Sequence, residues 1–129
     1  FLVSFEAIAS VPLFQELPIG AVGKINEKLE VLLVSEHETI FSKGDEADSM
    51  FIIEYGKVKV EIENPVYLVA GDYFGEMGLL GNVPRNATIS AADDTKLLEL
   101  TKSDLAELSE EHPGLFKELE LSASKRTSG

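Results

Sequence analysis

A glycine-rich stretch followed by an arginine is the part of this sequence best suited to chemistry. Residues 71–81 contain four glycines in eleven positions, and Arg85 follows them. Gly75 allows backbone N–H groups to approach an anion closely, at the start of a helical turn predicted for residues 76–80. A planar guanidinium donates two parallel hydrogen bonds to phosphate oxygens. Together these residues predict a cradle for a singly charged cyclic phosphodiester.

Glu76 lies inside this stretch and needs a different partner. A carboxylate beside a phosphate is repulsive unless it accepts hydrogen bonds, so its expected partner is a ribose hydroxyl. The pairing of Glu76 with Arg85 therefore favours a sugar phosphate over free phosphate. The residues alone leave an alternative open, which is a glycine-rich surface turn with an exposed Glu–Arg pair of little energetic weight.

The composition argues against several other kinds of site. A formal net charge of -12 disfavours binding to a nucleic acid polymer, which needs basic residues to displace counterions. The chain has no cysteine for disulfide or thiolate chemistry. His37 and His112 are its only histidines, too few for the metal centre of a β-barrel enzyme, and no serine lies in a glycine-flanked elbow. We therefore expect a binding domain with no metal or other cofactor, and keep a small β-barrel enzyme as the alternative.

Short runs of branched and aromatic residues between turn formers predict strands from residue 31 onward. In one run Val58, Val60 and Ile62 share a face, and charged residues share the other. Glycine and Asn-Pro turns between the runs are typical of antiparallel connections. We predict a mainly β fold, a jelly-roll-like antiparallel β-roll of about eight strands over residues 31–100. The runs are residues 31–34, 39–41, 50–55, 57–62, 66–70, 85–91 and 95–100.

Helices are predicted before and after the β-roll. In residues 1–30, apolar residues recur at helical spacing from residue 19 to residue 29. In residues 101–124, Thr101 or Ser103 caps one helix and Pro113 begins another.

The length of 129 residues is that of one domain. We therefore treat residues 1–129 as a single unit, with a polar tail at residues 125–129 that frays. The apolar runs are too short to cross a bilayer, so the chain is expected to be soluble.

The glycine-rich stretch closely resembles the phosphate-binding cassette of cyclic-nucleotide-binding domains. The matching strings are Phe-Gly-Glu-Met at residues 74–77 and Arg-Asn-Ala-Thr at residues 85–88, within a cassette of residues 71–91 that includes a short helix. The resemblance covers nearly the whole chain. It extends to an earlier signature of the family at Gly44-Asp45, Met50-Phe51-Ile52-Ile53 and Gly56-Lys57-Val58.

The resemblance implies a role for each cassette residue that matches. Arg85 would bind the cyclic phosphate, and Glu76 would bind the ribose 2′-hydroxyl. Backbone groups of Gly75, Met77 and Ala87 would complete the cradle.

Three further residues match positions around the purine. Val60 and Val66 match positions that pack on the base, although the pattern alone fits ordinary core residues. Arg126 matches a residue that closes over the base as a lid, although a solvated tail residue fits the sequence as well. Asn86 stands where related domains carry threonine when cGMP is favoured and often a small residue when cAMP is bound. Asparagine is neither, and we favour cAMP with cGMP as the alternative.

A narrower resemblance concerns the protein to which such a domain is attached. Val11-Pro12-Leu13-Phe14 and Asn64-Pro65-Val66 look most like the C-terminal gating domains of prokaryotic cyclic-nucleotide-gated potassium channels. This implies a monomeric regulatory domain at the cytosolic face of the membrane, whose terminal helices move on ligand binding and act on a covalently attached channel. The alternatives are a domain of another effector, such as a kinase or transcription regulator, and a structural module that uses the fold only for subunit contact.

Overall fold

The computed structural model describes residues 19–76, 83–114 and 117 of the chain. Within them, eight strands form two four-stranded sheets, in the orders β1-β8-β3-β6 and β2-β7-β4-β5. The paired strands run antiparallel. The elements are α2 Ile19–Lys28, β1 Glu30–Val34, β2 Thr39–Phe41, β3 Ser49–Tyr55, β4 Lys57–Glu61, β5 Val66–Val69, β6 Tyr73–Phe74, β7 Thr88–Ala91, β8 Thr95–Thr101 and α4 Lys102–Glu111.

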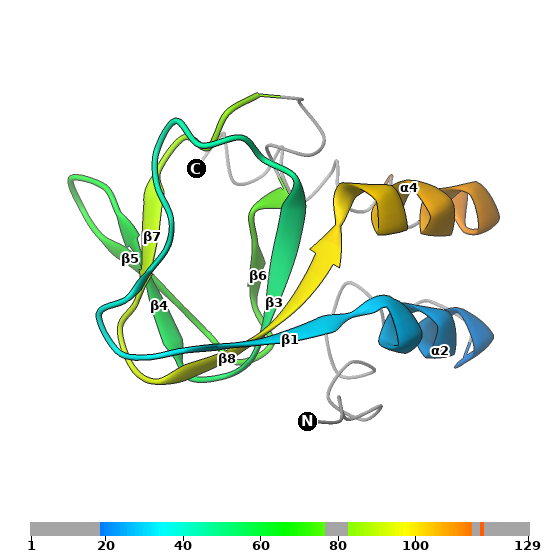
Figure 1. Cartoon of the computed structure of the whole chain (residues 1–129), viewed down its shortest axis with the longest axis horizontal. Coiled ribbons are helices and arrows are strands. Elements are labelled where there is room, and N and C mark those ends of the chain that lie inside the picture. The colour runs from blue at the N-terminus through cyan, green and yellow to red at the C-terminus, as the bar shows by residue number, and fades with distance from the viewer. Residues whose placement is uncertain (1–18, 77–82, 115–116, 118–129) are drawn as a thin grey trace.

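The strands curl into a roll, and helices α2 and α4 lie next to each other beside it (Figure 1). This arrangement confirms the predicted fold class, an antiparallel β-roll with flanking helices. Pro113, predicted to begin a second C-terminal helix, has helical backbone. The apolar residues predicted to follow it lie outside the described residues, as do the segment before residue 19 and the tail.

Strand β3 is buried on both faces, which explains its unbroken apolar run. Met50 and Ile52 belong to a core cluster that includes residues of α2 and α4. Phe51 and Ile53 point the other way, into a cluster formed by residues of both sheets. Because side chains alternate along a strand, only a strand covered on both sides reads as continuously hydrophobic. β3 therefore separates the helix-facing core from the interior of the roll.

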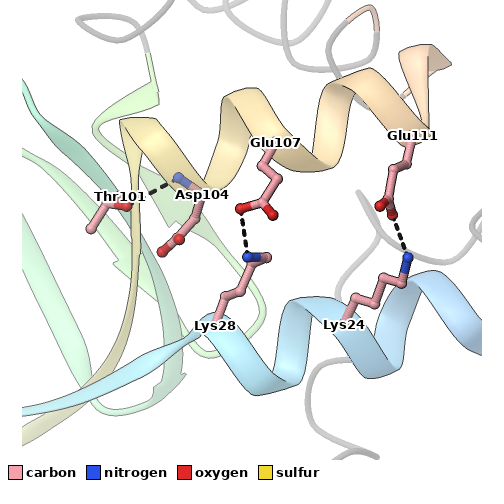
Figure 2. Close-up of polar contacts among 6 residues, drawn as sticks. All are labelled: Lys24, Lys28, Thr101, Asp104, Glu107 and Glu111. Carbon is pink, nitrogen blue, oxygen red and sulfur yellow. Dashed lines mark hydrogen bonds and ion pairs between the residues drawn. The ribbon is translucent and has the colours of Figure 1, made fainter.

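Helices α2 and α4 are joined by shared apolar side chains and by two ion pairs, and Figure 2 shows the ion pairs. Lys24 Nζ lies 2.6 Å from Glu111 Oε2, and Lys28 Nζ lies 2.8 Å from Glu107 Oε2. The hydrogen bond from Lys24 lowers the pKa of Glu111, and the hydrogen bond to Glu107 raises the pKa of Lys28. Exposed pairs of this kind add little to stability, so the buried side chains hold the helices. These are Val22, Ile25, Leu29, Leu105 and Leu108.

The start of α4 is fixed by one of the two predicted caps. The hydroxyl of Thr101 accepts a hydrogen bond from the backbone N–H of Asp104 at 3.1 Å (Figure 2). Thr101 is also the last residue of β8, so the strand passes directly into the helix. α4 has no basic residue in its last turn, and Lys24 of α2 supplies the positive charge that this end of a helix favours.

The largest differences from the sequence prediction concern β7 and β6. β7 begins at Thr88, although the predicted run began at Arg85. The backbone of Arg85 bonds instead to a turn at residues 44–45, which keeps it out of the strand ladder. β6 was not predicted because its two residues are too few to show alternation.

Candidate functional site

The backbone of Arg85 is anchored on the turn formed by Gly44 and Asp45. The N–H of Arg85 donates to the carbonyl of Asp45 at 2.8 Å, and the N–H of Gly44 donates to the carbonyl of Arg85 at 2.8 Å. Gly44 has a φ of +95°, which glycine adopts at little cost. The turn thus fixes where the arginine side chain leaves the backbone.

The guanidinium of Arg85 is turned inward onto two backbone carbonyls. Nη1 donates to the carbonyl of Gly75 at 2.7 Å, and Nη2 donates to the carbonyl of Ser49 at 2.6 Å. The residue is only 6% exposed, and its Nε makes no hydrogen bond to any described residue. A guanidinium has more N–H donors than these two carbonyls use. Arg85 therefore retains donors for an anion at this place.

The surroundings of Arg85 are acidic. Burial lowers the pKa of Arg85, and the nearby carboxylates, with those of Asp48 and Asp45 the strongest, act in the opposite direction. Arginine stays charged throughout the range in which proteins are stable. The site is thus a buried, permanent cation in a chain with a formal net charge of -12.

Gly75 lies against this cation in a conformation that favours glycine. Its φ is +87°, and a Cβ there would lie 2.9 Å from Nη1 of Arg85 and 3.3 Å from the carbonyl oxygen of Ser49. Glu76 follows as a fully buried residue with helical backbone. The structure therefore brings Gly75 and Arg85 together, through the Gly75 carbonyl, with Glu76 next in the chain.

Gly75→Ala is expected to weaken ligand binding by about tenfold or more, because the added methyl group displaces the Arg85 guanidinium. Gly71→Ala is the matched control. Gly71 has a similar φ of +94° with nothing within 4 Å of the added Cβ. Both variants should lose about 1 to 2 kcal/mol of stability from the backbone conformation. Calorimetric titration of the pair with cyclic nucleotide checks the difference, and equal affinities would contradict the close contact.

Two of the three residues predicted to surround a base, Val60 and Val66, lie at the β4–β5 hairpin. Val60 and Val66 are directly opposite each other in its register, and Val60 also pairs with Ile89 of β7. Val60 is half-buried and packs on the inner core, whereas Val66 is 46% exposed. An ordinary core role therefore fits Val60 but not Val66.

Of the four other predicted site residues, the structure describes two. Ala87 is buried and Asn86 is exposed, on the segment between Arg85 and β7. Met77 and Arg126 lie outside the described residues.

Two groups that touch Arg85 were missed at the sequence level. Ser49 contributes its backbone carbonyl, and a backbone acceptor leaves no signal in the residue type. Phe41 lies under the guanidinium, with 4.1 Å between the Arg85 Cζ and the ring centroid. Its place in a short apolar run gave it the appearance of a core residue.

The described residues contain no group of three or more histidine, cysteine, aspartate or glutamate residues placed to hold a metal ion. Neither α2, α4 nor any other helix in the described part of the chain has the length and apolar character that crossing a membrane requires.

Comparison with protein families gives a match to the cyclic nucleotide-binding domain over residues 31–112. A cyclic nucleotide-gated potassium channel of Rhizobium etli is 38% identical over 130 residues, which cover 100% of this chain and 37% of that protein. A cAMP-dependent protein kinase regulatory subunit of Mycosarcoma maydis is 40% identical over 108 residues, covering 77% of this chain and 21% of that protein. The chain thus spans little more than a third of the channel's length.

Solved structures show the same fold. The regulatory domain of Toxoplasma gondii PKA with cAMP superposes with a TM-score of 0.84 at 23% identity, covering 94% of this chain and 48% of that one. The catabolite activator protein of Thermus thermophilus gives 0.80 at 27% identity, covering 91% and 58%. The family match over residues 31–112, more than half of the chain, shows that the chain belongs to the cyclic nucleotide-binding domain family.

Proposed function

We propose that this domain binds a cyclic nucleotide, preferentially cAMP, and that Arg85 holds the cyclic phosphate. The observation that carries the proposal is the buried Arg85 guanidinium, bonded to the Gly75 carbonyl and with Nε directed to no described acceptor. Such a cation suits a singly charged phosphodiester because charge-assisted hydrogen bonds are strong where water is excluded. The preference for cAMP is supported by the relatives named as cAMP-dependent kinase subunits.

The remaining cassette residues complete the nucleotide site in this proposal. Glu76 accepts a hydrogen bond from the ribose 2′-hydroxyl, and its full burial suits a carboxylate with a defined partner rather than a solvated one. Backbone N–H groups of Gly75, Met77 and Ala87 bind the phosphate. The positive φ of Gly75 supports this part, since glycine has no Cβ and lets backbone N–H groups approach an anion closely.

The purine lies at the β4–β5 hairpin in the same proposal. Val60 and Val66 pack on the base, Arg126 covers it, and Asn86 contributes to the choice between cAMP and cGMP. The support comes from Val66, since a half-exposed valine opposite Val60 is an apolar surface that a planar base can cover.

Ligand binding is proposed to act on an attached effector through the terminal helices. Helices α2 and α4 pack together and contact β3 and β8, whose other faces line the interior of the roll. A ligand that binds more tightly when these helices are in one position shifts the equilibrium between the conformational states of the attached protein. A potassium channel is the first candidate for this effector, supported by the relative matched over the full length of this chain, and the domain would then lie at the cytosolic face of a membrane. A kinase regulatory subunit is the second candidate, supported by the 40% identical relative.

Calorimetric titration with cAMP, cGMP and 5′-AMP tests the ligand assignment. We expect saturable binding of cAMP and weaker binding of cGMP. Binding of 5′-AMP should be weaker than that of cAMP by about tenfold or more, because its phosphate carries a second negative charge and the carboxylates of Asp48 and Asp45 already act on Arg85. Chromatography after the titration should recover the cyclic nucleotide unchanged, which separates a binding domain from an enzyme. Absence of saturable binding by both cyclic nucleotides would refute the proposal.

A further inference from the structure

Phe41 makes a close contact with the cation of the proposed site. The Arg85 Cζ lies over the ring at 4.1 Å from its centroid, well within the range of a cation–π interaction. Because Arg85 is only 6% exposed, water does not compete strongly for this face of the guanidinium. The ring therefore attracts the cation and also blocks its movement in one direction.

An irregularity in strand β2 accounts for the inward position of Phe41. Thr39 pairs with Ser90 and Phe41 pairs with Ile89, so two steps along β2 match one step along β7. In a regular strand Ile40 and Phe41 would face opposite sides, yet both pack against the interior core cluster. A bulge re-aims a side chain in this way. The backbone thus turns the Phe41 ring toward Arg85.

The Phe41 ring is itself held by two other rings. Its centroid lies 5.9 Å from that of Phe74 and 6.1 Å from that of Phe51, and those two rings stack at 5.3 Å. Phe74 directly precedes Gly75, whose carbonyl accepts from Arg85. From strand β2, Phe41 therefore contacts both the Arg85 guanidinium and Phe74, the residue of β6 that precedes Gly75.

We propose that Phe41 is a positioning residue for phosphate binding, whose ring holds the Arg85 guanidinium in the orientation that presents its free donors to the ligand. This inference rests on the proposed function, because it assigns Phe41 a part in the binding of the cyclic phosphate by Arg85. The carbonyls of Gly75 and Ser49 hold the two Nη atoms through hydrogen bonds. The Phe41 ring packs against one face of the guanidinium and so fixes the orientation of its plane.

The ring contact can be tested without ligand by NMR of the arginine side chains. The sequence has two arginines, Arg85 and Arg126, so the Nε–H spectrum is simple, and Arg85→Lys assigns it. A proton over an aromatic face is shifted upfield by the ring current. We expect an upfield Arg85 Nε–H signal in the wild type that is retained in Phe41→Tyr and moves downfield in Phe41→Leu. An identical shift in all three proteins would overturn the proposal.

The effect on binding is tested by calorimetry with cAMP. Phe41→Leu should weaken binding by about tenfold and Phe41→Tyr by less than about threefold. Ile40→Ala is the control, because Ile40 packs in the same core cluster but has no ring. It should lower the Tm while leaving the affinity within about twofold of wild type. If Phe41→Leu does not fold, Phe41→Met is measured in its place against the same expectation.

A double-mutant cycle with Arg85→Ala separates this inference from the proposed function. If Phe41 acts through Arg85, Phe41→Leu should cause no further loss of affinity in the Arg85→Ala background. The positioning role fails if Arg85→Ala weakens binding but Phe41→Leu behaves like Ile40→Ala. The proposed function fails if the wild type does not bind cAMP or if Arg85→Ala binds like wild type.

Discussion

Arg85→Ala is expected to weaken cyclic nucleotide binding by about 30-fold to several thousand-fold, the cost of about 2 to 5 kcal/mol for losing one partner of a buried charge-assisted pair. The loss should be large here because the cation is buried and the surrounding side chains are acidic. Without Arg85, its positive charge would no longer offset the negative charges of Asp48 and Asp45, the two carboxylates that act most strongly on it. Calorimetric titration with cAMP measures the change directly.

Arg85→Lys and Lys43→Ala are the controls for this variant. Lysine keeps the charge but cannot form two parallel hydrogen bonds, so Arg85→Lys should bind with an affinity between those of wild type and Arg85→Ala. Lys43 is an exposed cation near the turn at Gly44, and its removal should change the affinity by less than about threefold. Thermal unfolding confirms that each variant is folded. A wild-type affinity in folded Arg85→Ala would refute the phosphate assignment.

Gly56→Ala is expected to destabilise the fold by about 2 to 5 kcal/mol, from the left-handed backbone and from overlap with strand β8. Gly56 has a φ of +100°, and an added Cβ would lie 2.5 Å from Oγ1 of Thr95 and 2.7 Å from both its Cα and the Asp94 carbonyl oxygen. Two of these atoms are backbone and cannot rotate away. The Thr95 hydroxyl also accepts from Lys57 N–H at 3.2 Å, which ties this turn to β8.

Gly44→Ala is the matched control for the stability measurement. Gly44 has a φ of +95° and nothing within 4 Å of an added Cβ, so only the backbone cost of about 1 to 2 kcal/mol should appear. Urea unfolding of both variants gives the difference in the free energy of unfolding. Losses of equal size would mean that the contact of Gly56 with β8 is not close enough to matter.

Much of the fold could be predicted from side-chain alternation and turn residues. The strict alternation in residues 57–62 corresponds to β4, and the unbroken apolar run in residues 50–53 belongs to β3, which is covered on both sides. β6 could not be predicted because two residues show no period. The start of β7 differed because the backbone of Arg85 bonds to a turn distant in sequence, which the local pattern of residues does not reveal.

The candidate site was predictable where residue type limits the chemistry. Gly75 and Arg85 could be paired because a glycine that lets backbone N–H groups approach an anion and a guanidinium that bonds phosphate oxygens suit the same ligand. Ser49 and Phe41 could not be identified, since one acts through its backbone and the other is turned inward by an irregular register. The exposure of Val66 likewise depends on the free edge of the β4–β5 hairpin, which the sequence pattern does not reveal.

A crystal structure of the domain with cAMP tests the central assignment most directly. We predict that phosphate oxygens of the nucleotide will lie within hydrogen-bond distance of the Arg85 guanidinium and of the backbone N–H groups that follow Gly75. The purine should lie against Val60 and Val66. A bound nucleotide whose phosphate lies away from Arg85, with that side chain still bonded only to the carbonyls of Gly75 and Ser49, would contradict the account.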